Sequence, residues 1–129
     1  MQVSCRSEKT SEKVHEEKSS LLHHHVYFDL NEDIESSELD EFTSIVDSLE
    51  LIPKVQGFTH GAYEDLKDPR ALSAYDYCLS MSFKNKIDYE VYQKHKIHLS
   101  VIKALSKFLK GPPATFDYKP RTPLNHEKQ

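Results

Sequence analysis

Apolar and polar residues alternate along residues 22–30, and this pattern predicts a β-strand. Successive side chains of a strand point to opposite faces of a sheet. One face is therefore expected to carry His24, Val26, Phe28 and Leu30, and the other His25, Tyr27 and Asp29. A strand of the same kind is predicted at residues 73–83. There, one face would carry Tyr75, Tyr77, Leu79, Met81 and Phe83, and the other Asp76, Cys78, Ser80 and Ser82.

Helical spacing of apolar residues predicts helices in two regions. The first runs over residues 37–49, where Ser37 and Asp40 resemble a capping box. The second region holds a short helix at 86–95 and a longer one at 96–110, which the Gly-Pro-Pro run at 111–113 ends. The apolar stripe of the longer helix is expected at Leu99, Ile102, Leu105, Phe108 and Leu109.

Two further strands are predicted at residues 54–63 and 114–118, the first made irregular by Gly57 and Gly61. The order of elements is then β-α-β-β-α-β, the split ferredoxin-like pattern of the α+β class. Helices would cover one face of a four-stranded antiparallel sheet. The other face, with Tyr27, Cys78 and Phe116, would stay bare in a monomer, so a second copy of the chain is its expected partner.

Composition limits how much of the chain can pack. Only 37% of the 129 residues are hydrophobic, and 29% are charged. The shortage lies at the ends, where too little apolar surface is available to offset the entropy of ordering the chain. We therefore predict a disordered tail at residues 1–20, a single domain at 22–120 and a C-terminal tail at 121–129.

Charge and cysteine content exclude several classes of protein. The net charge is −4 and the basic residues are scattered, so no nucleic-acid partner is expected. The two cysteines, Cys5 and Cys78, lie in unlike settings and do not indicate a disulfide framework. No apolar run resembles a signal peptide or a membrane span, so a cytoplasmic protein without a membrane partner is expected.

Three motifs in this order resemble the stress-responsive α/β-barrel (Dabb) family: HHVYFDL, VYQKHKIH and FDYKP. The resemblance covers about residues 22–120. It implies a ferredoxin-like domain that dimerises through its sheet faces into a dimeric α/β barrel. The family includes olivetolic acid cyclase, which forms an aromatic acid from a linear polyketide without a metal.

Several working positions of that enzyme are matched. Tyr92 and His98 fall on its catalytic tyrosine and histidine, His24 on a pocket histidine, and Asp117 on an aspartate near the catalytic histidine. Two positions depart from the pattern. Tyr77 replaces a further pocket histidine, and Lys96 replaces a proline that commonly follows the first histidine of the H-x-x-H motif.

The stretch VYQKHKIH admits three interpretations. In the first, His95 and His98 bind a metal, but a third ligand and the usual ligand motifs are missing, so neither a metal nor another cofactor is expected. In the second, the helix breaks at His95, and His98 acts as a base with Tyr92 as proton donor and Asp117 as its orienting partner. In the third, these side chains are structural, hydrogen-bonded parts of the core.

Under the second interpretation a small-molecule pocket would lie between the last helix and the sheet. Its expected lining is His24, Val26, Phe28, Tyr77 and Leu79. The predicted function is binding of a small, largely apolar organic molecule, with cyclase- or lyase-like acid–base chemistry as an option. The alternative is a non-enzymatic stress-responsive or interaction protein whose barrel is a structural dimer. An open apolar cavity beside His98 would favour small-molecule binding. A pocket filled by Tyr77, Met81 and Phe108 would favour the structural dimer.

Overall fold

A computed structural model of the chain describes residues 21–121, so the predicted tails, apart from Arg121, lie outside the described residues. The elements along the chain are β1 (Leu22–Phe28), α2 (Ser36–Asp47), the 3-10 helix η1 (Ser48–Leu51), β2 (Gln56–Ala62), β3 (Tyr77–Phe83), α3 (Lys86–Lys94), α4 (Lys96–Leu105), the 3-10 helix η2 (Ser106–Phe108) and β4 (Ala114–Tyr118). This is the predicted β-α-β-β-α-β order, with the second helical region divided in two.

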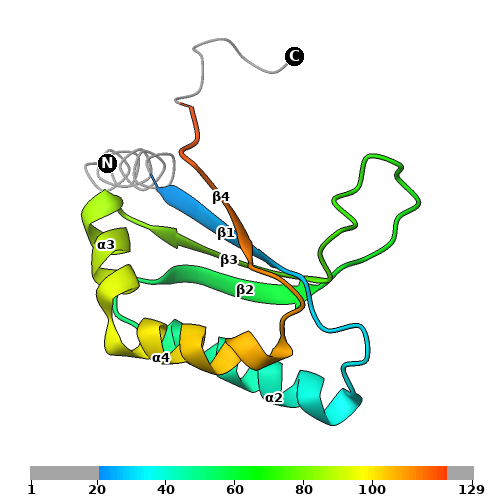
Figure 1. Cartoon of the computed structure of the whole chain (residues 1–129). Helices are drawn as coiled ribbons and strands as arrows, with labels where there is room; N and C mark the ends of the chain where they lie inside the picture. Colours follow the sequence, from blue (N-terminus) through cyan, green and yellow to red (C-terminus); the bar gives the residue numbers. More distant parts are fainter. Residues whose placement is uncertain (1–20, 122–129) are drawn as a thin grey trace, which may run out of the picture.

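The four strands form one sheet in the order β2-β3-β1-β4. All neighbouring strands run antiparallel. Figure 1 shows α2 and α4 beneath one face of this sheet, while no described helix covers the other. The ferredoxin-like α+β prediction is therefore confirmed. We call the uncovered side the open face.

The core lies between the covered face and the helices. Phe42 of α2 is fully buried at its centre. Its ring meets those of Phe28, Tyr77 and Phe108 edge to face, with centroid distances of 5.4, 5.2 and 5.9 Å. Edge-to-face packing is a favoured geometry for aromatic rings. One aromatic side chain thus joins α2 to two strands and to the end of the last helix.

The apolar stripe predicted for the last helix is wrong at two positions. Leu99 is 57% exposed and Ile102 is 55% exposed, whereas Val101, Leu105 and Phe108 are buried. The cause is the helical repeat. His98, Val101 and Leu105 lie three and four residues apart and share one helix face. Turning that face toward the sheet moves Leu99 and Ile102 outward.

Two smaller differences concern element ends. β3 begins at Tyr77, so Tyr75 belongs to the preceding loop, which Figure 1 shows projecting from one end of the sheet. The Tyr75 ring lies 5.9 Å from that of Tyr27, a residue of the open face, and does not extend the buried row of β3. The first helix begins with a capping box of Glu35 and Glu38 in place of the predicted Ser37 and Asp40.

Candidate functional site

A break between α3 and α4 places the candidate catalytic residues. His95 has an extended backbone (φ −65°, ψ 141°), and its Nδ1 accepts a hydrogen bond from the Ile97 N–H at 3.1 Å. His95 therefore ends α3 and is the N-cap of α4, which is the helix break of the second interpretation. On one straight helix, Tyr92 and His98 would point about 120° apart. With the break, their ring centroids lie 4.5 Å apart.

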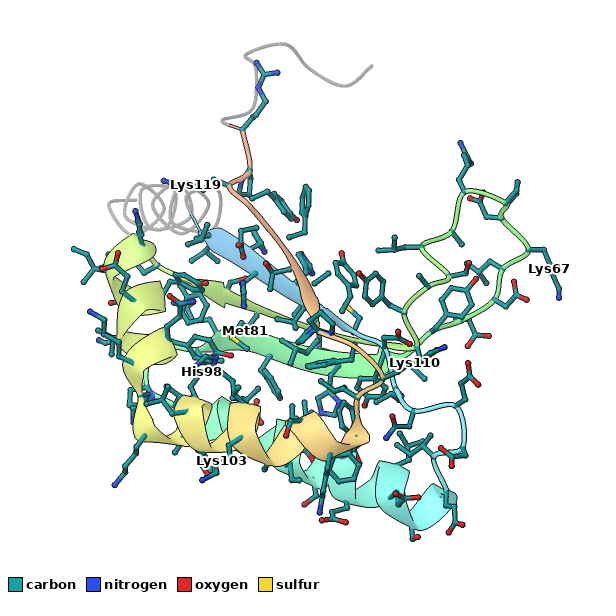
Figure 2. All side chains as sticks on the ribbon, viewed as in Figure 1. Lys67, Met81, His98, Lys103, Lys110 and Lys119 are labelled. Carbon is teal, nitrogen blue, oxygen red and sulfur yellow. The ribbon has the colours of Figure 1, made fainter. Side chains whose placement is uncertain are left out.

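A cavity of about 520 Å³ opens beside these two rings, between the helices and the covered face of the sheet. Figure 2 shows His98 between α4 and the sheet. Aliphatic side chains and proline rings dominate the lining. The lining residues are His24, Val26, Phe28, Leu49, Leu79, Tyr89, Tyr92, Gln93, His98, Val101, Ile102, Leu105, Ser106, Leu109, Gly111, Pro112, Pro113 and Thr115.

His98 carries the features of a base. Its Nδ1–H donates to the Gln93 carbonyl oxygen at 2.9 Å, which fixes the tautomer and leaves the lone pair on Nε2. Burial lowers the pKa of His98, the hydrogen bond to Gln93 raises it, and the nearby His24 lowers it; the net direction is down. A lowered pKa means that the imidazole is neutral and able to accept a proton at neutral pH.

Asp117 pairs with His24 and not, as predicted, with His98. The pairing of β1 with β4 puts His24 directly opposite Asp117 on the covered face. The Nδ1 of His24 and the Oδ1 of Asp117 form a hydrogen bond. The His24 side chain is 5% exposed and the Asp117 side chain 41%. Strand register therefore decides this contact, and it links a buried imidazole of the cavity to a carboxylate that reaches solvent.

Tyrosines form the wall of the cavity nearest the histidines. Tyr92 is buried, and burial raises its pKa strongly, so its hydroxyl remains a proton donor. Tyr89, which the sequence interpretation missed, lines the same cavity, with its ring 5.2 Å from that of His24. Tyr89 precedes Tyr92 by three residues, a spacing that puts two side chains on one helix face and could have identified it.

Tyr77 does not line this cavity, although it was predicted to. Its hydroxyl lies 2.6 Å from His60 Nδ1, and His60 Nε2 lies 2.6 Å from Asp47 Oδ1. The Asp47 carboxylate can only accept, so His60 Nε2–H donates to it, and a neutral His60 then accepts the Tyr77 O–H at Nδ1. These two hydrogen bonds connect the end of α2 to β2 and β3. The other predicted lining residues, His24, Val26, Phe28 and Leu79, do line the cavity.

Two kinds of feature are missing from residues 21–121. No group of three or more His, Cys, Asp and Glu side chains there is arranged to hold a metal ion. No helix of that part of the chain is both long enough and apolar enough to cross a membrane.

Solved structures with the same fold come from bacteria and plants. A hydroxynitrile lyase from Passiflora edulis superposes with a TM-score of 0.67 at 11% identity, covering 78% of this chain and 93% of the lyase. A Dabb family protein with a ferredoxin-like fold from Mesorhizobium loti gives 0.62 at 23% identity, covering 80% and 99%. A dimeric ferredoxin-like protein of unknown function from Thermobifida fusca gives 0.65 at 17% identity, covering 78% and 91%. At these identities the likeness shows the fold alone.

Sequence comparison supplies the family. A search of curated proteins found no significant match. The family model described as the stress responsive A/B barrel domain matches residues 22–119, which is nearly all of the described chain. The chain therefore belongs to the stress-responsive A/B barrel domain (Dabb) family.

Proposed function

We propose that this chain binds a small, largely apolar organic molecule in the cavity and moves protons to and from it by acid–base chemistry. One observation carries the proposal: a cavity of about 520 Å³, walled mainly by apolar groups, lies against a histidine whose Nε2 is free to accept a proton. Small-molecule sites are typically apolar cavities of this size with a few convergent polar groups.

The proposed roles follow from the geometry. His98 Nε2 takes a proton from a carbon next to a carbonyl group of the bound molecule. The electron pair left by that proton moves onto the carbonyl oxygen, and the Tyr92 hydroxyl donates a hydrogen bond to the negative charge that develops there. Asp117 is a positioning residue, because its hydrogen bond holds the ring of His24 against the cavity. Lyase chemistry occurs on this fold in the Passiflora hydroxynitrile lyase.

One exposed apolar residue of α4 favours ligand binding over a purely structural role for the cavity. Ile102 lines the cavity while remaining more than half exposed, so it lies at the opening. Met81 and Phe108, which would fill the pocket of a merely structural barrel, pack in the core and are absent from the lining. An apolar side chain at a cavity opening is available for contact with an apolar ligand.

Titration with the neutral fluorescent probe N-phenyl-1-naphthylamine tests the binding. The wild-type chain should bind it saturably, at one probe per chain. Val101→Trp places an indole in the cavity and should weaken binding at least about tenfold, which corresponds to about 1.4 kcal/mol. Leu99→Trp is the matched control, because Leu99 lies on the same helix but points to solvent. Circular dichroism would verify that both variants fold.

Two outcomes would contradict the proposal. One is the absence of saturable binding by the wild type. The other is equal weakening in both tryptophan variants, because this would place the probe outside the cavity. Either would favour a barrel that serves only as a structural dimer.

We propose further that the working form is a homodimer joined through the open faces. Strand register assigns the residues of this face. They are His23, His25, Tyr27, Gln56, Thr59, Gly61, Cys78, Ser80, Ser82, Ala114, Phe116 and Tyr118. None is Asp, Glu, Lys or Arg, in a chain in which 29% of residues are charged. A sheet face without charge suits burial against a second copy, and the absence of Lys and Arg disfavours nucleic acid.

Light scattering at micromolar concentration should report about twice the chain mass. Tyr27→Glu should give a monomer, because it would bury an unpaired carboxylate at the interface. Val91→Glu is the control, since Val91 is exposed on α3, away from the sheet. A monomeric wild type, or equal effects of the two glutamates, would contradict the homodimer. The cytoplasmic location expected from the sequence remains a prediction.

A further inference from the structure

Two imidazole rings and a phenol ring are stacked on the open face. The ring of Tyr118 lies 5.0 Å from that of His23, with 14° between their planes, and 5.8 Å from that of His25, with 4° between them. Ser82 Oγ lies 3.0 Å from His23 Nδ1. Tyr118 is 45% exposed and the neighbouring Phe116 61%. The stack therefore lies at the surface that the proposed dimer would bury.

Few other groups can carry charge near this stack. On β1 the same face holds Tyr27, with the loop residue Tyr75 against it. On β3 it holds Cys78, and burial raises the pKa of that thiol, so it stays neutral. β2 contributes Gln56, Thr59 and Gly61, which do not titrate.

The carboxylate that influences His25, that of Asp117, lies on the opposite side of the sheet. Asp117 and Lys119 of the β4 segment both line a hollow beside Tyr89, on the covered side. Asp117 forms its hydrogen bond there with His24. Among the described strand residues of the open face, His23 and His25 are the only histidines, and histidine is the residue type that ordinarily gains a charge between pH 8 and 5.

Protonation of this stack would oppose association. In a two-fold interface the same patch meets itself, so both copies of His25 and both copies of His23 enter one buried surface. Burial already lowers the pKa of His25 in the single chain, and the neighbouring His23 and His24 lower it further, while Asp117 raises it. Desolvation by a second copy acts in the same direction as burial. A group with a lower pKa in the dimer than in the monomer stabilises the dimer above that pKa range, and the stabilisation is lost as the pH falls through it.

We propose that His23 and His25 make this assembly pH-sensitive, so that the dimer forms at neutral pH and dissociates to folded monomers as the pH falls below about 6. The inference rests on the homodimer proposed above and adds its regulation. Because acid would separate the subunits while the cavity lies on the covered side of each sheet, ligand binding within one chain need not be lost with the dimer.

Sedimentation equilibrium of the full chain at pH 7.5 and 5.5 tests this. The dissociation constant should rise by about tenfold or more, the size expected when even one imidazole per chain must lose its proton on association. Near-ultraviolet circular dichroism at pH 5.5 would verify that the fold is retained. His25→Lys makes the charge permanent and should be monomeric at both pH values.

Neutral replacements complete the test. His23→Gln with His25→Gln removes both groups that gain charge, and this variant should dimerise equally at the two pH values. His25→Gln alone should reduce the response if the double variant does not fold. His95→Asn is the control, because asparagine retains the N-cap and the stack is untouched, so its pH response should match the wild type.

The outcomes separate the two proposals. A wild type that is monomeric at pH 7.5 overturns the homodimer and this inference with it. A dimer with the same dissociation constant at both pH values overturns only the role of the histidines. A pH response that persists in the double glutamine variant likewise overturns the role of the histidines and leaves the homodimer in place.

Discussion

Replacement of His98 by alanine is expected to lower the rate of proton abstraction in the cavity by about 10²- to 10⁴-fold, the usual contribution of a positioned base. A suitable probe is 5-nitrobenzisoxazole, a small apolar molecule. A base removes its carbon-bound proton, the ring N–O bond breaks, and a coloured phenolate forms. The rate is followed by absorbance. His98 should accept that proton through Nε2, because Nδ1 is engaged by Gln93.

The pH profile gives this prediction a second readout. Burial lowers the pKa of His98 below its ordinary value of 6.5. Since only the neutral imidazole accepts a proton, the rate should be level at neutral pH and fall as the pH drops through a midpoint below 6.5. His95→Asn should leave the rate unchanged, because asparagine retains the N-cap of α4 and His95 does not line the cavity. Equal rates in the wild type and His98→Ala would end the catalytic proposal.

Phe42→Ala is expected to cost about 3–5 kcal/mol in free energy of unfolding, the range for truncation of a fully buried aromatic residue. Phe42 has no exposed surface, and its ring contacts aromatic rings from β1, β3 and η2. The loss should be visible in urea unfolding at fixed chain concentration. Leu51→Ala is the control, since Leu51 is 73% exposed and its truncation should cost less than about 0.5 kcal/mol.

A cost below about 1 kcal/mol for Phe42→Ala would mean that the aromatic contacts around α2 do not hold the core. It would also weaken the account of the cavity. Phe28, one of the rings that Phe42 supports, forms part of the cavity lining.

The order of elements and the helix break could be predicted from sequence because each depends on local pattern. Alternation in residues 22–30 fixed which face His24 would take, and the structure buries His24 on the covered face. Local pattern predicted separate helices at 86–95 and 96–110, and the second interpretation required the break at His95, because Tyr92 and His98 diverge on a straight helix. The cap forms although Lys96 stands where the family commonly has proline, since the imidazole itself accepts the Ile97 N–H.

Contacts between distant elements could not be predicted in the same way. Asp117 pairs with His24 because of the register between β1 and β4, and a one-residue slip would have turned Asp117 to the other face. Tyr77 lies on the expected face but reaches His60 of the neighbouring strand, whose irregular backbone hid its pattern. The orientation of α4 depends on its tertiary packing, and helical spacing alone did not place Leu99 and Ile102 correctly.

Nuclear Overhauser effects between N-phenyl-1-naphthylamine and the labelled protein would show whether an apolar molecule occupies the space beside His98. If the proposed site is correct, the probe contacts the ring protons of His98 and the methyl groups of Val101 and Leu79, all of which line the cavity. Contacts confined to Phe116 and Tyr118 of the open face, or no contacts at a saturating probe concentration, would contradict it.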